Sequence, residues 1–424
     1  MHELFVLLLL VIIAALIFDY INGFHDTANS IATVVSTRVL KPSQAVFMAA
    51  IFNLIGAFLG VEVAKTIGKG IVETASITQL TVLSALLGAI VWNLLTWYFG
   101  IPSSSSHALI GGLCGSSAAY GGMNVIKANG LMHKVFLPMI ISPLLGITIG
   151  FFFMLSLYWL LAAAKPGVVN KIFSKLQLVS AGLMALSHGS NDAQKTMGII
   201  TMALISYTVL TVSNVGNASL DTSKLVSSDT SAIQTINRKD IISKFINEGG
   251  KISNFNGTYK AFQKNNSKPG GYEEIKSLDP VTVRDLQLSL NGRELNPGEE
   301  YEVKFHIPTW VVLACAIAMA LGTLAGGWRI IHTLGSKMIK LQPIHGFAAE
   351  TSAAIMILGA STFGMPVSTT HIISTSIMGV GASKRFSSVK LGIVGNIVIA
   401  WIFTFPISFA LGWLCFNILH LFFN

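Results

Sequence analysis

Charged residues are scarce in this sequence. They make up 11% of its 424 residues, whereas hydrophobic residues reach 52% and the mean hydropathy is +0.66. Ordinary soluble proteins carry about 25% charged residues, so this class is excluded. The apolar runs are long enough to cross a hydrocarbon core of roughly 30 Å as helices. Because they are continuous rather than alternating, they exclude a β-barrel and indicate a polytopic helical membrane protein.

The sequence contains few cysteines, and its N-terminus does not have the pattern of a secretory signal peptide. The sequence has three cysteines, all within apolar segments, which predicts buried thiols and no disulfide framework. The N-terminus lacks a basic region, and Asp19 follows without a cleavage site, so we interpret it as the first transmembrane helix. The net charge of +9 does not indicate nucleic acid, because the basic residues cluster in short loops between apolar runs.

Two polar motifs interrupt this apolar background. Residues 22–29 follow the apolar run 4–18, and residues 187–195 follow the apolar run 176–186. A carboxylate at the centre of a membrane helix costs roughly 2.5–3.5 kcal/mol on insertion scales, so such residues are usually functional. We expect the first helix to be broken between Asp19 and Asp26.

The two motifs can be superimposed. Aligning Gly23 with Gly189 places Asp26 on Asp192 and Asn29 on Lys195. Further along each half comes a Gly-x-x-x-Gly pair, typical of close helix packing, and then a proline followed by hydroxyl residues and a histidine. The interval from glycine pair to proline is nearly equal in the two halves. The chain is therefore predicted to contain an internal repeat.

The repeat predicts the fold class and domain boundaries. We expect an all-α polytopic membrane protein with two inverted-topology repeats of about five crossings each, broken or half helices, and a small hydrophilic external insert. The boundaries are 1–175 for the first repeat, 176–212 for the start of the second, 213–307 for the insert and 308–424 for the remainder. Alternation and turn signals in 281–305 predict some β structure in the insert.

Loop charges predict the orientation. Most basic residues outside the insert fall on one side of the membrane if each half crosses five times. The positive-inside rule then places both termini and the insert outside. The expected location is a bacterial inner membrane, with the chain spanning it several times.

Pro102 and Pro366 precede runs of hydroxyl residues that open short helices. Hydroxyl groups and free backbone N–H groups at a helix N-terminus form an anion site that the helix dipole favours. Two such elements, one from each half, would clasp an oxyanion, although each run alone also fits an ordinary N-cap. The candidate residues are Ser103, Ser104, Ser105, Ser368, Thr369 and Thr370.

Carboxylates beside an anion site require an explanation. Either a cation binds with the anion, held by oxygen and amide ligands from Asp26, Asn29 and Asp192, or the anion carries its own proton. Phosphate has such a proton near neutral pH and sulfate does not. An ion pair of Asp192 with Lys195 is the structural alternative.

The candidates for coupling are His25, Glu350 and Lys195. A histidine in a polar motif can relay protons. A carboxylate within an apolar helix is usually functional.

The polar motifs carry a resemblance. Gly-Phe-His-Asp-Thr-Ala-Asn at 23–29, the motif at 187–195 and the paired Pro-x-Ser-x-x-His elements resemble the inorganic phosphate transporter (PiT) family, closest to its bacterial low-affinity Pit branch. The resemblance covers both membrane halves and implies phosphate symport with protons or sodium, or of a neutral metal–phosphate complex. It implies substrate-binding roles for Asp26, Asn29, Asn191, Asp192, the serines after Pro102 and residues 368–370. We add Gln194 of the second motif to the substrate-binding candidates.

Other functions remain open at this point. A sulfate-carrying branch of the family leaves sulfate or another oxyanion as an alternative substrate. A membrane hydrolase would use Ser104 or Ser105 with His107 and Asp26, but its triad would need no duplicate. An anion channel would not need buried carboxylates. We expect a transporter rather than an enzyme, with no cofactor beyond the coupling cation. Its expected partners are inorganic phosphate, that cation and the lipid bilayer, but no nucleic acid; a homodimer is left open.

Overall fold

The computed structural model describes residues 2–73, 77–218, 250–255, 258–264, 272–275, 283–287, 294–297, 299–302, 307–385 and 389–423. The chain divides into two compact units. The helical unit comprises Leu10–Val72, Leu80–Ile200 and Ile307–Asn424. The second unit comprises Met1–Leu9, Glu73–Gln79 and Thr201–His306.

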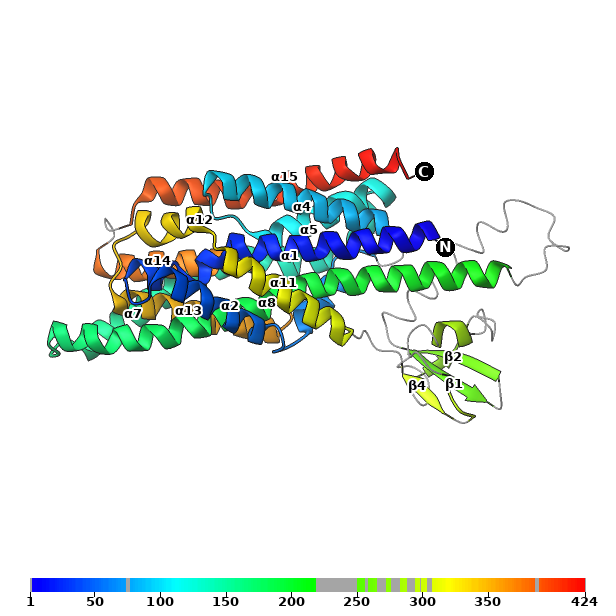
Figure 1. Ribbon diagram of the computed structural model, residues 1–424, viewed down its shortest axis with the longest axis horizontal. Coiled ribbons are helices and arrows are strands. Elements are labelled where there is room, and N and C mark those ends of the chain that lie inside the picture. Colours follow the sequence, from blue (N-terminus) through cyan, green and yellow to red (C-terminus); the bar gives the residue numbers. More distant parts are fainter. Residues whose placement is uncertain are drawn as a thin grey trace. The chain divides into compact units, whose positions relative to one another are not determined.

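Helices that lie side by side build the helical unit (Figure 1). In the first half of the chain they are α1 (His2–Ser36), α2 (Pro42–Gly56), α3 (Glu62–Lys69), α4 (Gln79–Phe99), α5 (Ser105–Gly121), α6 (Ala128–Leu131), the π-helix η3 (Met132–Phe136) and α7 (Leu137–Leu160). In the second half they are α8 (Pro166–Ala218), α11 (Thr309–Ala325), α12 (Trp328–His332), the π-helix η5 (Thr333–Lys337), α13 (Pro343–Thr362), α14 (Thr369–Lys384) and α15 (Leu391–His420).

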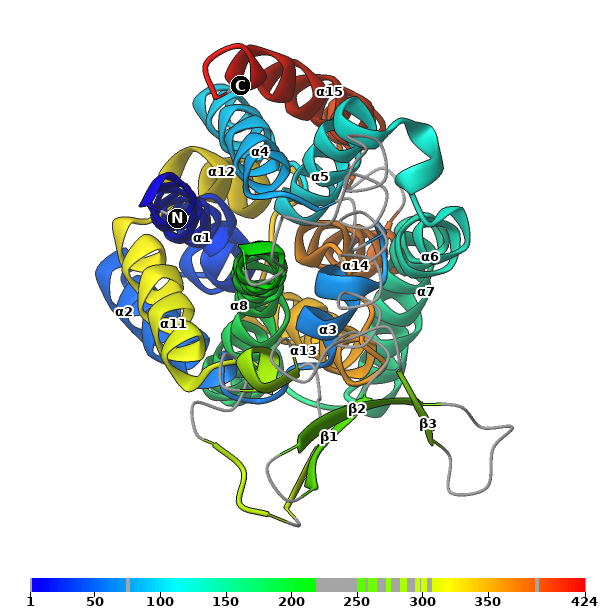
Figure 2. The same ribbon diagram turned by 90° about the vertical axis from the view of Figure 1, so that its right-hand side faces the viewer.

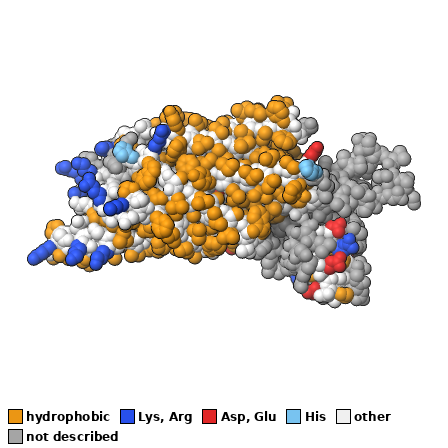
Figure 3. Space-filling view, viewed as in Figure 1, with side chains coloured by type: hydrophobic (Ala, Val, Ile, Leu, Met, Phe, Trp, Pro, Cys, Tyr) orange, Lys and Arg blue, Asp and Glu red, His pale blue; other side chains and the backbone are white. Residues whose placement is uncertain are grey.

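Several of these helices fit a membrane. Among the described residues, four are long and apolar enough to span one: His2–Ser36, Gln79–Phe99, Ala128–Leu160 and Gly392–His420. A fifth results if Thr309–Ala325 and Trp328–Gly335, which meet at 61°, form one broken span. A band of hydrophobic side chains covers the middle of the helical unit, and Lys and Arg gather at the end where α7 joins α8 (Figure 3). The expected five crossings per half remain a prediction.

The expected break of the first helix at Asp19–Asp26 is wrong. The backbone is helical throughout α1, and α8 likewise continues through the second polar motif. The polar side chains there find partners on neighbouring helices, so the backbone need not unwind to satisfy them. The hydroxyl of Thr27 on α1, for example, donates to the Thr323 carbonyl of α11 at 3.3 Å.

The glycines of the repeat bring helices of opposite halves together. A Cβ added to Gly23 of α1 would lie 2.5 Å from the Met319 carbonyl oxygen of α11, and one added to Gly322 would lie 2.0 Å from that of Tyr20. The same relation joins α8 to α2, where Gly189 abuts Asn53. Each half therefore packs its first helix against the second helix of the other half.

The short helices α5 and α14 also pack against helices of the other half. Helix α5 of the first half packs along α15, and α14 of the second half packs along α7. Figure 2 shows both pairs, together with α1 beside α11. The two halves are thus interleaved, and α5 and α14 enter the interior between them.

The real breaks in the helices precede α5 and α14. Gly100 and Gly364 have φ of 66° and 64°, a left-handed conformation that glycine adopts without strain. Each ends its helix, with the following backbone N–H returning to the carbonyl of Thr96 or Ala360 at 2.9 Å. An extended segment containing the predicted proline then leads into the short helix.

The insert contains the expected β structure, but mainly in another place. Its antiparallel sheet has the order β3-β2-β1-β4, with β1 (Gly250–Phe255) in register with β2 (Thr258–Lys264) through Ile252 and Ala261. Strands β3 (Tyr272–Glu274) and β4 (Glu300–Glu302) flank this pair. Within the described part of the predicted stretch 281–305, residues 283–287 are helical and β4 is strand. The turn signal at 291–292 lies outside the described residues.

Candidate functional site

The N-termini of α5 and α14 meet inside the helical unit. Ser104 and Ser368 are the N-caps, and each side chain accepts a hydrogen bond from the backbone N–H three residues later at 3.2 Å. The rings of His107 and His371 lie against each other, with centroids 4.9 Å apart. Both residues are therefore N-caps, and the two helix ends lie close together. These are helix ends with free N–H groups, which attract anions.

Helix α1 brings one carboxylate to this locus. Asp26 is 3% exposed, and its Oδ1 lies 2.6 Å from Nδ1 of His25 and 3.4 Å from the Thr370 hydroxyl of α14. The other ring nitrogen of His25 reaches Thr96 at 3.2 Å and Ser103 at 3.4 Å. The adjacent His25 thus ties Asp26 to the extended segment before α5.

Helix α8 brings the second carboxylate and a cation. Asp192 is fully buried, and Nζ of Lys195 lies 2.5 Å from its Oδ1. The Lys195 ammonium also donates to the Ser106 hydroxyl and, at 3.2 Å, to the Val367 carbonyl. The ion pair considered from the sequence is therefore present, and it connects α8 to the openings of both short helices.

The two carboxylates lie together. Ligand atoms of Asp26, His188 and Asp192 are all within 4.8 Å of one another, a grouping able to hold a metal ion. Nε2 of His188 is 3.1 Å from Oδ2 of Asp192, and its Nδ1 is 3.1 Å from Asn53 Oδ1. Two carboxylates and an imidazole are groups that can bind a small cation. Without a bound cation, the repulsion between the Asp26 and Asp192 carboxylates is offset by the Lys195 ammonium and by hydrogen bonds from nearby hydroxyl groups.

Asn29 links the first polar motif to α14. Its amide donates to the hydroxyls of Thr369 and Thr370 at 3.3 and 2.9 Å, and Thr369 also lies 3.3 Å from Oδ2 of Asp192. Among the described residues, nothing hydrogen-bonds to the buried atoms Asn29 Oδ1 and Ser105 Oγ. Unsatisfied polar atoms are uncommon inside proteins, so they are candidates for contact with a ligand.

Three predicted residues lie elsewhere or have other partners. The Gln194 side chain accepts from the Val63 backbone at 2.9 Å and donates to the Ser190 carbonyl at 2.6 Å, which gives it a local structural role. Asn191 donates to Ser361 at 2.8 Å. Glu350 forms a separate buried cluster that we describe next.

The Glu350 cluster joins α13 to α1 and α8. Its carboxylate accepts from Thr33, from Ser180 and, at 3.3 Å, from the Gln177 amide. It is fully buried and shares no hydrogen bond with the Asp26–Asp192 group. The structure therefore separates this coupling candidate from the central site.

Sequence reasoning missed three residues of the site. His188 stands four residues before Asp192, on the same helix face, a spacing that could have identified it. Ser106 was covered only by the resemblance, among the serines after Pro102, and was not named as an individual candidate. Thr96 could not be identified from the sequence, because nothing near it in the chain indicates that the C-terminal part of α4 contacts His25.

The hydrolase arrangement is not assembled. Ser104 Oγ accepts from the backbone of His107, while Asp26 pairs with His25. The His107 ring instead lies against His371. Serine, histidine and aspartate therefore do not form the chain of contacts that a nucleophile needs.

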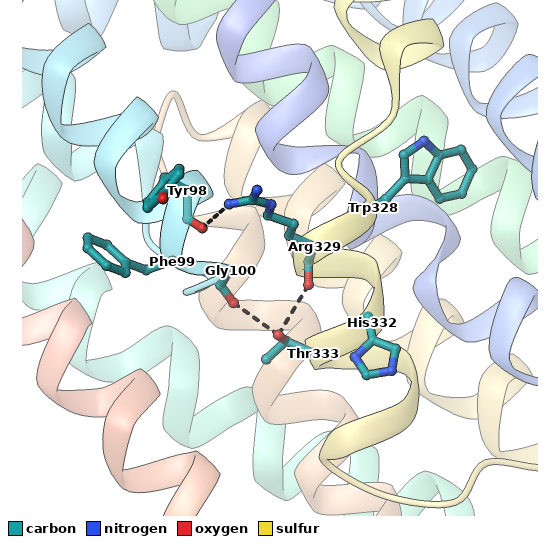
Figure 4. A pocket seen from close by; sticks show the side chains of 7 residues that line it. All are labelled: Tyr98, Phe99, Gly100, Trp328, Arg329, His332 and Thr333. Carbon is teal, nitrogen blue, oxygen red and sulfur yellow. Dashed lines mark hydrogen bonds between the residues drawn. The ribbon is translucent and has the colours of Figure 1, made fainter.

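A surface pocket of about 480 Å³ shares no residue with this buried cluster (Figure 4). It is lined by Tyr98, Phe99, Gly100, Trp328, Arg329, His332 and Thr333. The Arg329 guanidinium lies 4.8 Å from the Tyr98 ring centroid and donates to that residue's carbonyl. The Thr333 hydroxyl donates to the Gly100 carbonyl at 2.9 Å. These contacts hold the turn at Gly100, which connects α4 to the segment leading into α5.

Comparison with known proteins gives a consistent family. A sequence model described as "Phosphate transporter family" matches residues 22–412. The chain is 40% identical over 413 residues to a "Probable low-affinity inorganic phosphate transporter" of Rhizobium meliloti (strain 1021), covering 97% of this chain and 96% of the relative. A protein of the same name from Bacillus subtilis (strain 168) is 37% identical over 425 residues, covering all of both chains. A solved structure titled "The sodium-dependent phosphate transporter" has the same fold, with a TM-score of 0.62 at 23% identity, covering 98% of this chain and 99% of that one.

Proposed function

Because this chain belongs to the phosphate transporter family, we propose that it imports inorganic phosphate together with a cation. The observation that carries the proposal is the convergence of two carboxylates and two hydroxyl-capped helix N-termini in one buried cluster. The helix ends favour an oxyanion, and the carboxylates favour one that arrives with a proton or a cation. Phosphate meets both requirements.

The substrate site in this proposal lies between α5 and α14. The hydroxyls of Ser105, Thr369 and Thr370, together with the first backbone N–H groups, donate to the phosphate oxygens. Asp26 and Asp192 either accept the proton that phosphate carries or hold a cation with Asn29 and His188. The buried ammonium of Lys195 offsets part of the added negative charge.

Alternating access follows from the interleaved halves. Reciprocal contacts of α1 with α11 and of α8 with α2, and of α5 with α15 and α14 with α7, support two repeats of inverted topology. The site lies where the halves meet, so a movement of one helix group against the other would open it to each side in turn. The basic end of the helical unit faces the cytoplasm, which places both termini outside.

Sulfate is the second substrate to test. Fully ionised sulfate has no proton to share with Asp26 or Asp192, so its charge would face these carboxylates without a hydrogen bond between them. The buried cluster therefore favours phosphate, and we expect sulfate to compete weakly.

Uptake by proteoliposomes tests the function. The full chain should accumulate radiolabelled phosphate under an inward proton or sodium gradient, and unlabelled sulfate should compete poorly. Asp26→Asn and Asp192→Asn should each abolish uptake. Glu62→Gln is the matched control, because this carboxylate is exposed and pairs with Lys65 at 2.6 Å.

The outcomes separate the alternatives. If the rate of phosphate flux did not depend on any imposed cation gradient, the protein would be a channel and coupled import would be refuted. Equal competition by sulfate would refute the substrate assignment. Full activity in either Asp→Asn variant would remove that residue from the site.

A further inference from the structure

Helices α1 and α8 share a seam of buried polar residues at three levels. The central level is Asp26 with Asp192. Towards the C-terminus of α1, the hydroxyls of Thr33 and Ser180 meet on Glu350. Towards the N-terminus of α1 lies a third level, where the Thr196 hydroxyl donates to Oδ1 of Asp19 at 2.9 Å.

Asp19 lies on the same face of α1 as Asp26. The two residues are seven positions apart, which is close to two helical turns. Thr196 follows Asp192 by about one turn on α8. The antiparallel helices thus place the Asp19 level directly beyond the central site, on the side that the proposed orientation makes external.

The carboxyl group of Asp19 is the least satisfied of the buried carboxyls. It is 0% exposed, and among the described residues its Oδ2 has no hydrogen-bond partner. Glu350 has three donors, and Asp192 has the ammonium of Lys195. An ionised carboxylate with a single hydroxyl donor is costly at this depth, because one hydrogen bond replaces little of the hydration that the charge loses on burial.

A second buried acceptor stands beside it. Asn22 is three positions after Asp19 on the same helix, and its Oδ1 also has no donor among the described residues. Residues three apart on a helix are neighbours. A proton on Oδ2 would remove the charge of Asp19 and would place an O–H donor on the helix face that carries Asn22.

We propose that Asp19 is a proton-binding site, loaded from the external side, that couples proton entry to the import of phosphate. The inference rests on the proposed function and deepens it. One proton from external water joins Oδ2, no bond in the protein breaks, and the proton returns to water on the other side. The ionisable groups that act on Asp19 are Asp192 and Lys195 on α8 and Cys315 on α11. Thr196 and Asp192 share one face of α8, so a displacement of α8 moves both levels together.

Asp19→Asn in the full chain tests this assignment, because asparagine keeps the shape and cannot exchange a proton. Phosphate counterflow at equal pH on both sides of the vesicle should persist, since it needs no net proton movement. Accumulation under an inward proton gradient should lose its dependence on that gradient, which is about tenfold per pH unit for one coupled proton. Asp19→Glu should retain the dependence, and so should the exposed control Glu62→Gln.

An infrared measurement supplies a readout that does not require transport. One C=O stretching component of a protonated carboxylic acid should shift in Thr196→Val and disappear in Asp19→Asn, as read from the difference spectrum of each variant against the wild type, in which the bands of the other buried carboxyls cancel. An unchanged band in both variants would overturn the proposal, as would a full gradient response in Asp19→Asn. If the wild type shows no phosphate counterflow, the proposed function fails instead, whatever Asp19 does.

Discussion

Removing one partner of the Asp192–Lys195 pair should destabilise the protein strongly. Both side chains are at most 2% exposed, and Nζ lies 2.5 Å from Oδ1. Lys195→Met leaves the Asp192 carboxylate without its cation, and Asp192→Asn leaves the ammonium without its anion. Breaking a buried pair on one side costs about 3–5 kcal/mol, because the remaining charge is uncompensated.

The double variant Asp192→Asn/Lys195→Met should recover most of this loss. It removes both charges, and the Val367 carbonyl keeps a donor in Ser106 at 3.3 Å. We expect its unfolding free energy to lie within about 1–2 kcal/mol of the wild type, since buried pairs are often replaceable as a unit. The double variant should nevertheless fail to take up phosphate, which separates the structural from the functional role of the pair.

Reversible unfolding by denaturant in detergent micelles measures these differences. Tryptophan fluorescence can report the transition. The double-mutant cycle should give a coupling free energy of about 3 kcal/mol or more. Single variants as stable as the wild type, or strictly additive effects in the double variant, would refute the pairing described here.

Three further predictions concern packing, capping and topology. Gly322→Val should cost about 1–3 kcal/mol of unfolding free energy, because the added side chain would overpack against Tyr20. Gly359→Ala should not have this cost, because within the described part of the chain its added Cβ meets no atom within 4 Å. Thermal unfolding measures both effects. Ser104→Ala and Ser368→Ala should each cost about 1 kcal/mol through loss of an N-cap, and uptake assays should show a raised KM for phosphate; an unchanged KM in both would show that the caps do not form part of the site. Protease added to intact cells should cleave within residues 213–307, and cleavage only in inverted vesicles would reverse the orientation.

The sequence predicted the elements of the site because polar residues stand out in an apolar chain. Asp26, Asp192 and the two hydroxyl runs are conspicuous, and their repetition indicated that they belong together. The structure brings their side chains into one cluster. Short helices after Pro102 and Pro366 were also predictable, since proline and hydroxyl residues are start signals with a local cause.

Long-range partners were not predictable in the same way. The backbone stays helical through both polar motifs because acceptors and donors on other helices satisfy the side chains, which the local sequence does not reveal. Gln194 looked like a ligand residue, yet its amide is taken by backbone groups of α3 and α8. Thr96 and His188 joined the site only through contacts between distant segments.

The interleaving of the two halves has a consequence for biogenesis. Gly23 of α1 fits against α11, and α5 fits along α15, so the matching surfaces are synthesised only near the end of translation. A nascent first half would expose its carboxylate and its small-residue faces to lipid until the second half arrives. We therefore expect the first half expressed alone to be less stable in the membrane than the full chain. Two separately expressed fragments could still assemble, because their complementary faces lie on different halves.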